Sequence, residues 1–483
     1  MNRARRGLLP ALLLLGAGGL AAATLAQRVD AVLAASPASR GAFWGIQAVD
    51  LASGKTTYEL NPNRFFVPAS NAKLFTTALA LMALGPEAIF RTRVLAAGLP
   101  DDDGGLTGSL RLLGGGDPSI DIADLADQVA AKGVRRVAGD IVGDDTWYVW
   151  QPYAEGWSLE DPNTKDGAAV SALAVNGNSQ TLAVRPGAAL GSPAALSFNP
   201  ALEYFRIENH TRTVAADSER SIRADRLPGS RLLRIWGSIP LRDRGEDLGL
   251  GIDDPALFAA LALRRALGER GIAVEGSVVA EHLFPEDVAD LKRAPAPPEA
   301  AEGVELARRE SPPLLECLRV VDKLSQNLQA EMMLRAVGRA RRNVGSREAG
   351  LEEMKTFLAE AGIPAGAYDL LDGSGMTRLN LVTPAAVVRL LRHMYASPSW
   401  QDFLSLLPVG GEDGTLAGRF SGAAQTGRVH AKTGSLAHVS ALSGYAQRPG
   451  DSWVAFSILV NNYEGQPAEI RRTIDRVCAL IME

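Results

Sequence analysis

The chain has 483 residues, 46% of them hydrophobic and 22% charged, which is the composition of an ordinary soluble protein long enough for about three domains. Its 50 Lys and Arg stand against 55 Asp and Glu, a formal net charge of −5. This balance excludes a disordered or collagen-like chain and argues against a nucleic-acid partner held by phosphate contacts. The two cysteines cannot hold a disulfide framework. We expect Cys317 and Cys478 to be buried apolar residues, with a single disulfide between them as the alternative.

Residues 1–26 have the pattern of an export signal. Three arginines among the first six residues precede an apolar stretch from Leu8 to Leu20, and the small residues of 21–26 offer cleavage sites of the A-x-A kind. We therefore expect export to the periplasm or cell envelope, with no transmembrane span left once the signal is removed. An uncleaved signal, which would tether the protein to the membrane, is the alternative.

The first elements expected after the signal are a hairpin and a buried helix. Strands are predicted over 43–50 and 56–60, joined by a short turn. The segment 70–84 is apolar nearly all round and is followed by Gly85 and Pro86, which is typical of a helix C-terminus. A helix with this pattern should be buried.

From about residue 96 to about residue 295 the sequence changes to short β-branched runs separated by Gly, Asp, Asn and Pro. We expect 96–295 to form an inserted strand-rich unit of two nested subdomains, with a proline cluster at 295–298 as its exit linker. The flanking parts, 27–95 and 296–483, would together form a second domain.

The last third of the chain returns to helices and ends with strands and a closing helix. Helices are predicted over 312–321, 329–341, 347–361 and 384–395, strands over 429–436, 439–447 and 453–461, and the closing helix over 469–482. Since strands occur near both ends of the chain, we expect them to share one sheet.

Metal and nucleotide sites have no support in the sequence. None of the five histidines falls in an H-E-x-x-H pattern, and no phosphate-binding glycine loop follows a predicted strand. The G-x-S-x-G turn of the α/β-hydrolases is also absent. We therefore expect no metal and no cofactor.

Ser70 and Lys73 form an S-x-x-K motif at the start of the predicted helix. Residues three apart share a helix face, so the Lys73 amine can reach the Ser70 hydroxyl. A serine is a weak nucleophile unless a neighbouring base takes its proton, and a lysine whose pKa is lowered by burial can be that base. The alternative is structural, with Ser70 as a helix N-cap and Lys73 as a solvated lysine.

Two further motifs lie far along the chain. An S-x-N motif at Ser325 and Asn327 falls between two predicted helices, while a competing match at 197–199 is interpreted as a turn. A K-T-G motif at 432–434 lies in the extended run 429–436, which should be an edge strand lining a cleft. Each motif alone is also explained by an N-cap, a turn or an exposed lysine.

With the motifs in the order S-x-x-K, S-x-N and K-T-G, the sequence resembles the penicillin-recognising serine acyl-transferase family. About 250 residues separate Lys73 from Ser325, and the strand-rich unit fills this gap. The layout is similar to the D-alanyl-D-alanine carboxypeptidase/endopeptidase group, the low-molecular-mass class C enzymes of the penicillin-binding protein 4 type. Further matches to this group lie at 67–70, 114–119, 171–173 with Asn176, 372–375 with Arg378 and Asn380, and 432–436.

The resemblance implies an α+β fold of the penicillin-binding and serine β-lactamase type. An antiparallel five-stranded sheet flanked by helices would form the peptidase domain from 27–95 and 296–483, with the strand-rich insertion 96–295 between the first two motifs. Ser70 would attack the D-Ala-D-Ala bond of peptidoglycan stem peptides, or a β-lactam antibiotic, and form an acyl-enzyme that water resolves.

The same resemblance implies roles for the other motif residues. Lys73 would be the base for Ser70, Ser325 would pass a proton to the departing D-alanine nitrogen, and Asn327 would hold Lys73 and the substrate amide. Lys432 would face the terminal carboxylate. The residues that would bind substrate around this centre are Thr433, Gly434, Ser435, Leu436, Met376, Arg378, Trp157 and Asp161. For Asp161 the alternative is Glu160, and for Trp157 a place in the core.

Several alternatives stay open. Trimming of the terminal D-alanine and cutting of D-alanyl cross-links share one acyl-enzyme, so the sequence does not decide between them. A β-lactamase of the same fold would need a dedicated deacylating carboxylate, which the sequence does not identify. A non-catalytic peptidoglycan-binding module would not need the complete set of motif residues. A homodimer is also left open.

Overall fold

The computed structural model describes residues 23–294, 302–450 and 452–483. Most of the predicted export signal and the proline cluster at 295–298 lie outside the described residues. The first described helix, α1 (Leu25–Ala35), starts inside the range predicted as signal, with a capping box between Thr24 and Gln27, and packs against α10 (Pro467–Ile481). Among the described helices, none has the length and apolar character needed to cross a bilayer.

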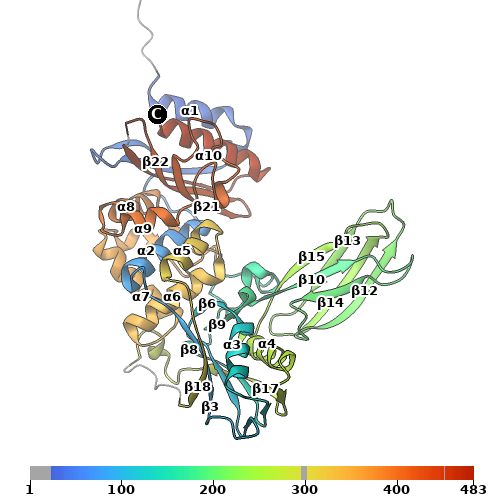
Figure 1. The fold of residues 1–483 in the computed structure, drawn as a ribbon. Coiled ribbons are helices and arrows are strands. Elements are labelled where there is room, and N and C mark those ends of the chain that lie inside the picture. The colour runs from blue at the N-terminus through green and yellow to red at the C-terminus, as the bar shows by residue number, and fades with distance from the viewer. Residues whose placement is uncertain (1–22, 295–301, 451) are drawn as a thin grey trace, which may run out of the picture.

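A five-stranded antiparallel sheet lies next to α1 and α10 (Figure 1). In spatial order its strands are β2 (Thr56–Leu60), β1 (Phe43–Asp50), β23 (Trp453–Asn461), β22 (Val439–Gln447) and β21 (Val429–Leu436). The predicted sharing of one sheet by N-terminal and C-terminal strands is confirmed, because β1 pairs with β23 along its whole length. Side chains of β23 alternate between two cores, so the sheet is covered on both faces.

Six helices of the described chain form a layer on the other side of this sheet and share one hydrophobic core. They are α2 (Lys73–Leu84), α5 (Leu314–Lys323), α6 (Asn327–Arg342), α7 (Arg347–Glu360), α8 (Pro384–Ala396) and α9 (Trp400–Leu406). Helix α2 is buried over Lys73–Leu81, as its apolar sequence predicts, and a 3₁₀ turn, η2 (Ala69–Ala72), precedes it. Cys317 and Cys478 are both free and buried.

The chain between α2 and α5 builds a second unit around a mixed five-stranded sheet. Its order is β17 (Val278–Leu283), β8 (Ile141–Val149), β5 (Leu110–Leu113), β3 (Arg91–Ala96) and β18 (Val304–Glu310). Two helices that the sequence analysis did not predict, α3 (Ile122–Ala131) and α4 (Pro255–Glu269), pack on it. The domain boundaries at 96 and 295 stay a prediction, but β3 starts before the first boundary and β18 lies beyond the second.

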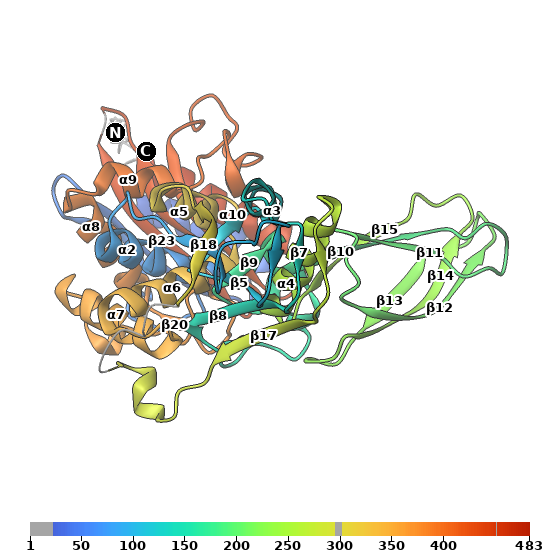
Figure 2. The same ribbon diagram turned by 60° about the horizontal axis from the view of Figure 1, so that its bottom comes forward.

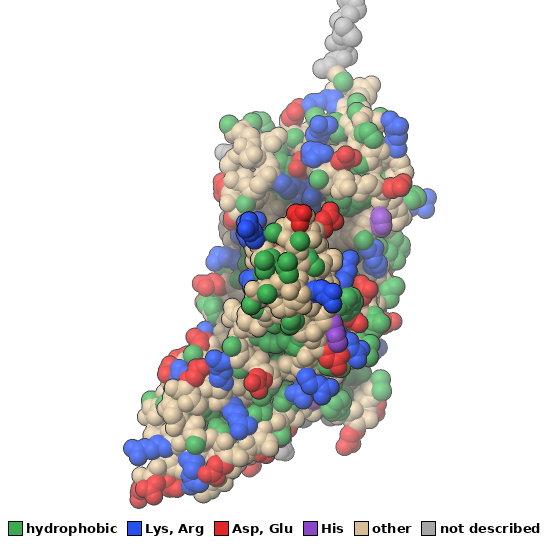
Figure 3. All heavy atoms as spheres, turned by 90° about the vertical axis from the view of Figure 1, so that its right-hand side faces the viewer, with side chains coloured by type: hydrophobic (Ala, Val, Ile, Leu, Met, Phe, Trp, Pro, Cys, Tyr) green, Lys and Arg blue, Asp and Glu red, His purple; other side chains and the backbone are tan. Residues whose placement is uncertain are grey.

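A six-stranded arm projects from this unit (Figure 2). It consists of two three-stranded sheets, with the orders β11-β10-β15 and β12-β14-β13. The strands are β10 (Ser179–Arg185), β11 (Ala195–Asn199), β12 (Arg206–Val214), β13 (Ser221–Asp225), β14 (Leu232–Pro240) and β15 (Glu246–Gly251). Viewed with the arm toward the reader, a group of hydrophobic side chains lies at the centre of this face, and acidic and basic side chains are interspersed around it (Figure 3).

Short strands complete the fold. They are β4 (Gly105–Leu106), β6 (Asp117–Ile120), β7 (Arg136–Val137), β9 (Leu173–Val175), β16 (Ala273–Val274), β19 (Tyr368–Asp369) and β20 (Leu381–Val382). The competing S-x-N match at 197–199 lies in β11, an arm strand, and not in the turn that was predicted. Because β11 belongs to the projecting arm, this S-x-N match lies away from the helical layer that carries Lys73.

Candidate active site

Ser70 and Lys73 lie where the 3₁₀ turn η2 passes into α2. The Lys73 Nζ donates a hydrogen bond to the Ser70 Oγ at 3.0 Å. Neither structural alternative holds, because Ser70 makes no capping hydrogen bond to α2 and the Lys73 side chain is fully buried. The S-x-x-K spacing therefore joins a buried amine to a partly exposed hydroxyl, as one helix turn allows.

The Lys73 amine has two more partners, from distant parts of the chain. It donates to the Asn327 Oδ1 at 2.7 Å and to the backbone carbonyl of Ser374 at 2.6 Å. Burial and, after it, the positive charge of Lys432 lower the pKa of Lys73 to about 7, against the attraction of Asp372 and other acidic groups. A large fraction of the amine is therefore unprotonated near neutral pH.

The S-x-N motif occupies the turn between α5 and α6. Ser325 has a φ of 60°, in the left-handed region that non-glycine residues seldom adopt, and this turn directs its hydroxyl to Lys432. Asn327 is the first residue of α6 and donates its Nδ2 to the carbonyl of Asp166 in the inserted unit at 3.0 Å. The Asn327 side chain is thus held from both sides, by Lys73 and by the insertion.

The K-T-G motif lies on β21, which is an edge strand of the five-stranded sheet as expected. The Lys432 Nζ donates to the Ser325 Oγ at 2.9 Å, and the Asn71 side chain donates to the Lys432 carbonyl at 2.9 Å, which fastens η2 to the strand. A Cβ at Gly434 would lie 2.7 Å from the Pro68 carbonyl oxygen, so only glycine allows this close approach. Three remote segments therefore meet at one place.

The loop 372–375 closes the site behind Lys73. The Asp372 carboxylate accepts from the Gly375 amide at 2.7 Å, the Thr377 amide at 2.9 Å and the Trp157 Nε1 at 3.0 Å. Gly375 has a φ of +81°, and a Cβ there would lie 1.9 Å from the Ala69 carbonyl oxygen. The loop is therefore packed directly against the residue that precedes Ser70.

The substrate-binding residues predicted around this centre are only partly brought together. Trp157 is half-buried and bonded to Asp372, while Arg378 is exposed and donates to the Ala437 carbonyl at 2.8 Å, just beyond β21. The Asp161 carboxylate accepts a hydrogen bond from the Ser158 amide at 2.7 Å, so it stabilises the turn in which Asp161 itself lies. Of the others, Ser435 is exposed, Thr433, Leu436 and Met376 are half-buried, and Gly434 is buried.

Two buried acidic residues at the site were missed by the sequence analysis. Asp322 lies in the last turn of α5, fully buried, and neither carboxylate oxygen has a hydrogen-bond partner among the described residues. Burial raises its pKa, and the attraction of Lys432, the nearby Thr77 hydroxyl and the attraction of Lys73 oppose that shift in this order. The Thr77 hydroxyl donates to the Lys73 carbonyl at 2.8 Å, so its proton is already engaged. The place of Asp322 three residues before Ser325 is visible in the sequence but does not by itself mark a site residue.

The other missed residue is Glu331, four positions after Asn327 on α6. Its Oε1 accepts from the amides of Gly373 at 2.8 Å and Ser374 at 2.9 Å, and its Oε2 pairs with Arg335 at 3.0 Å. Glu331 and Arg335 are both buried. Glu331 therefore fixes the loop whose Ser374 carbonyl accepts from Lys73. An acidic residue on the buried face of a helix was the available signal.

Comparison with known proteins agrees with this geometry. The family model of the D-Ala-D-Ala carboxypeptidase 3 (S13) family matches residues 25–480. A D-alanyl-D-alanine carboxypeptidase of Actinomadura sp. is 36% identical over 93% of this chain and 83% of its own length, and the D-alanyl-D-alanine carboxypeptidase DacB of Haemophilus influenzae is 25% identical over 88% and 86%. The crystal structure of penicillin binding protein 4 from Haemophilus influenzae superposes with a TM-score of 0.80 at 24% identity, covering 93% of this chain and 97% of that one. The resemblance and the fold class predicted from the motifs are thereby confirmed, and the chain belongs to the D-Ala-D-Ala carboxypeptidase 3 (S13) family.

Proposed function

We propose that this protein is a serine D-Ala-D-Ala carboxypeptidase that acts on peptidoglycan stem peptides through an acyl-enzyme on Ser70. The observation that carries the proposal is the buried Lys73 amine, which has Ser70, Asn327 and Ser374 as its three partners. A neutral amine has two N–H groups and one lone pair. The ammonium form donates to all three partners, and when it loses a proton the two remaining N–H groups serve the oxygens of Asn327 and Ser374, which leaves the lone pair for the Ser70 proton.

The first chemical step follows from that arrangement. Lys73 takes the Ser70 proton while Oγ bonds to the carbonyl carbon of the penultimate D-alanine. The carbonyl oxygen becomes an oxyanion, and the backbone amides of Ser70 and Ser435 would stabilise it. One such donor is worth about 3 kcal/mol in the transition state.

The leaving group departs on the side of Ser325 and Lys432. The C–N bond breaks as the nitrogen takes a proton from the Ser325 hydroxyl, and Lys432, which donates to that hydroxyl at 2.9 Å, replaces it. The Lys432 ammonium also attracts the carboxylate of the terminal D-alanine, with Thr433 beside it. Proton exchange with solvent then restores the neutral amine of Lys73 and the ammonium of Lys432. Lys73 next takes a proton from the water that attacks the acyl-enzyme and releases Ser70.

The residues outside this centre would read the third residue of the stem peptide. Met376 and Leu436 offer half-buried apolar surface, and Trp157 and Asp161 come from the inserted unit. The exposed Arg378 would pair with a carboxylate, which suits a zwitterionic side-chain end such as that of diaminopimelate. DD-endopeptidase cleavage of cross-links is the second activity that this acyl-enzyme would support.

Peptidoglycan and β-lactams are the proposed partners, and the periplasm or cell envelope is the proposed location. The names of the relatives, which are D-alanyl-D-alanine carboxypeptidases, support peptidoglycan stem peptides as the substrate. A solved structure of the Haemophilus influenzae protein is described as a complex with a novel β-lactam, which supports β-lactams as ligands. The location rests on the signal pattern of residues 1–26. A homodimer stays a prediction.

The deciding experiment is intact mass spectrometry after exposure to benzylpenicillin, followed over time. The parent protein should gain the full mass of the drug, because ring opening loses no atoms, and Ser70→Ala should gain nothing. A lasting adduct supports a penicillin-sensitive peptidase, whereas rapid return to the free mass would favour the β-lactamase alternative. Release of D-alanine from a peptide ending in D-Ala-D-Ala, but not from its C-terminal amide, would support the role of Lys432.

A further inference from the structure

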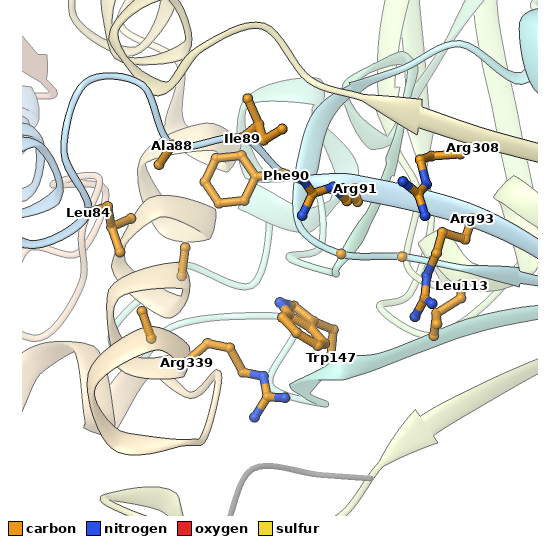
Figure 4. A pocket seen from close by; sticks show the side chains of 14 residues that line it. Leu84, Ala88, Ile89, Phe90, Arg91, Arg93, Leu113, Trp147, Arg308 and Arg339 are labelled. Carbon is orange, nitrogen blue, oxygen red and sulfur yellow. The ribbon is translucent and has the colours of Figure 1, made fainter. Parts of the chain in front are cut away.

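A cavity of about 660 Å³ lies where the inserted unit meets the helical layer, away from the active site (Figure 4). One wall comes from Leu84 at the end of α2, from the segment 88–90 that follows it, and from α6 near Arg339. The other wall comes from β3, β5 and β18. Helix α2 has Leu84, which lines the cavity, at one end and Lys73 at the other. Its twelve residues span about 18 Å, so this length of helix separates the cavity from the active site.

The composition of this cavity is split between cations and apolar groups. Four arginines line it, Arg91, Arg93, Arg308 and Arg339. The rest of the lining is largely apolar and includes Phe90, Leu113 and Trp147, the last of which is 38% exposed. A volume of this size is typical of small-molecule sites that are mostly apolar with a few fixed polar groups.

Two of the arginines oppose each other without an anion between them. In the antiparallel pairing of β3 with β18, Arg93 lies directly opposite Arg308, and like charges in that position destabilise a sheet. Arg91, two residues before Arg93 on the same strand, faces Glu310 and pairs with it at 2.8 Å. Arg308 pairs only with its neighbour Glu305, and Arg93 has no side-chain partner among the described residues. The strand pair therefore keeps an uncompensated positive charge toward the cavity.

Arg339 supplies a second cation from the opposite wall. Its guanidinium carbon lies 4.1 Å from the centre of the Trp147 ring, which orients it by cation–π contact. Its Nη1 donates to the Asn343 carbonyl at 2.5 Å, and its Nε is enclosed. Among the described residues its Nη2 has no hydrogen-bond partner, so this group is the part of Arg339 that an anion in the cavity would meet.

We propose that this cavity binds an amphiphilic anion, with a carboxylate or phosphate held by Arg93, Arg308 and Arg339 and an apolar body against Phe90 and Trp147. Arginine suits both headgroups because its planar fork binds either oxyanion through two donors. Neither a purely inorganic anion nor a neutral detergent satisfies both halves of the lining. The proposal does not depend on the chemistry at Ser70.

Titration calorimetry on the full chain tests the proposal with four probes: octyl phosphate, octanoate, inorganic phosphate and octyl glucoside. We expect one or both of the charged amphiphiles to bind at least tenfold more tightly than inorganic phosphate and octyl glucoside. The comparison of octyl phosphate with octanoate identifies the preferred headgroup. Binding of octyl glucoside as tight as that of the better charged amphiphile, or no binding of either charged amphiphile, overturns the proposal.

Variants locate the binding. Arg93→Gln should weaken the better amphiphile at least fivefold, while Arg135→Gln, an exposed arginine of the same unit outside the cavity lining, should leave the affinity unchanged. Because Arg93→Gln removes a repulsion, we expect its Tm to equal or exceed that of the parent, so lost binding would not reflect unfolding. Unchanged affinity in Arg93→Gln and in Arg339→Gln would place the ligand elsewhere and overturn the proposal.

Discussion

Replacing Asp322 by Asn should shift the pH dependence of acylation, because this buried carboxylate acts on both catalytic amines. The substitution keeps the volume and removes the negative charge. Asp322 attracts Lys432 more strongly than Lys73. Losing an anion lowers the pKa of a nearby ammonium, so both lysines should lose their protons at lower pH than in the parent, and Lys432 should change more.

The size of the shift follows from Coulomb's law. Within the part of the chain that the structure describes, no lysine donates a hydrogen bond to either Asp322 oxygen, so its charge acts on the two amines through space. Two unit charges 4 Å apart at an effective dielectric constant of 20 attract by about 4 kcal/mol, which is an upper bound, and about 1.4 kcal/mol corresponds to one pKa unit. We therefore expect the pKa of Lys432 to fall by about one to two units.

The assay is the second-order rate constant for acylation by a fluorescent penicillin, measured across the stable pH range. The parent should give a bell, since acylation needs Lys73 neutral and Lys432 charged. Its acidic limb should lie near pH 7, the value to which burial lowers the pKa of Lys73. In Asp322→Asn the basic limb should move toward lower pH, which narrows the bell and lowers its maximum. At pH values that protonate Asp322, the two profiles should converge.

The matched control is Asp117→Asn, because Asp117 is an equally buried carboxylate in the inserted unit. Its profile should coincide with that of the parent. If Asp322→Asn loses stability but keeps both limbs of the parent profile, Asp322 serves packing alone and the electrostatic reasoning is refuted.

Three further predictions concern residues in direct contact at the site. Ser70→Ala should abolish labelling by fluorescent penicillin without a change in Tm, and persistent labelling would remove Ser70 as the nucleophile. Lys73→Met should slow acylation about 10²- to 10⁴-fold, measured by stopped-flow, since the base is lost; a rate within tenfold of the parent would contradict that role. Glu331→Gln leaves the buried Arg335 without its anion and should cost about 3–5 kcal/mol of unfolding free energy in urea titrations. A loss below about 1 kcal/mol, the size expected of an exposed pair, would show that the pair is not effectively buried.

The strands of the main sheet could be predicted because their pattern is local. The segments 439–447 and 453–461 match β22 and β23 to the residue. β-branched and aromatic residues fill the second segment, whereas the first has only Val439 and Tyr445 of these types and is delimited by the turn residues Pro449 and Gly450 that follow it. Helix α1 was missed because its first residues lie within the small-residue stretch of the signal pattern. Its packing against α10, more than 400 residues away, is a tertiary contact that no local pattern reveals.

The residues of the active site also fall into those that a local sequence pattern reveals and those that only tertiary contacts reveal. Ser70, Lys73, Ser325, Asn327 and Lys432 could be named because their side-chain chemistry is visible in the motifs. Asp322 could not be found without the coordinates, because its effect depends on being enclosed with two amines from other segments. The contact of Asn327 with the Asp166 carbonyl was also hidden, since every residue carries a carbonyl.

The pairing of β3 with β18 lets the long insertion leave and rejoin the helical layer at one point. Arg91 lies opposite Glu310 in that ladder, so the chain returns within about 5 Å of where it departed. In evolutionary terms the insertion is a unit with both attachment points side by side, and a replacement would also have to fill the places of Tyr148, Val170 and Ala172, which share the hydrophobic core of α2 and α5. What a swap would alter is the flank of the cleft that Trp157 and Asp166 supply, so new substrate preferences could arise while the reaction chemistry is inherited intact.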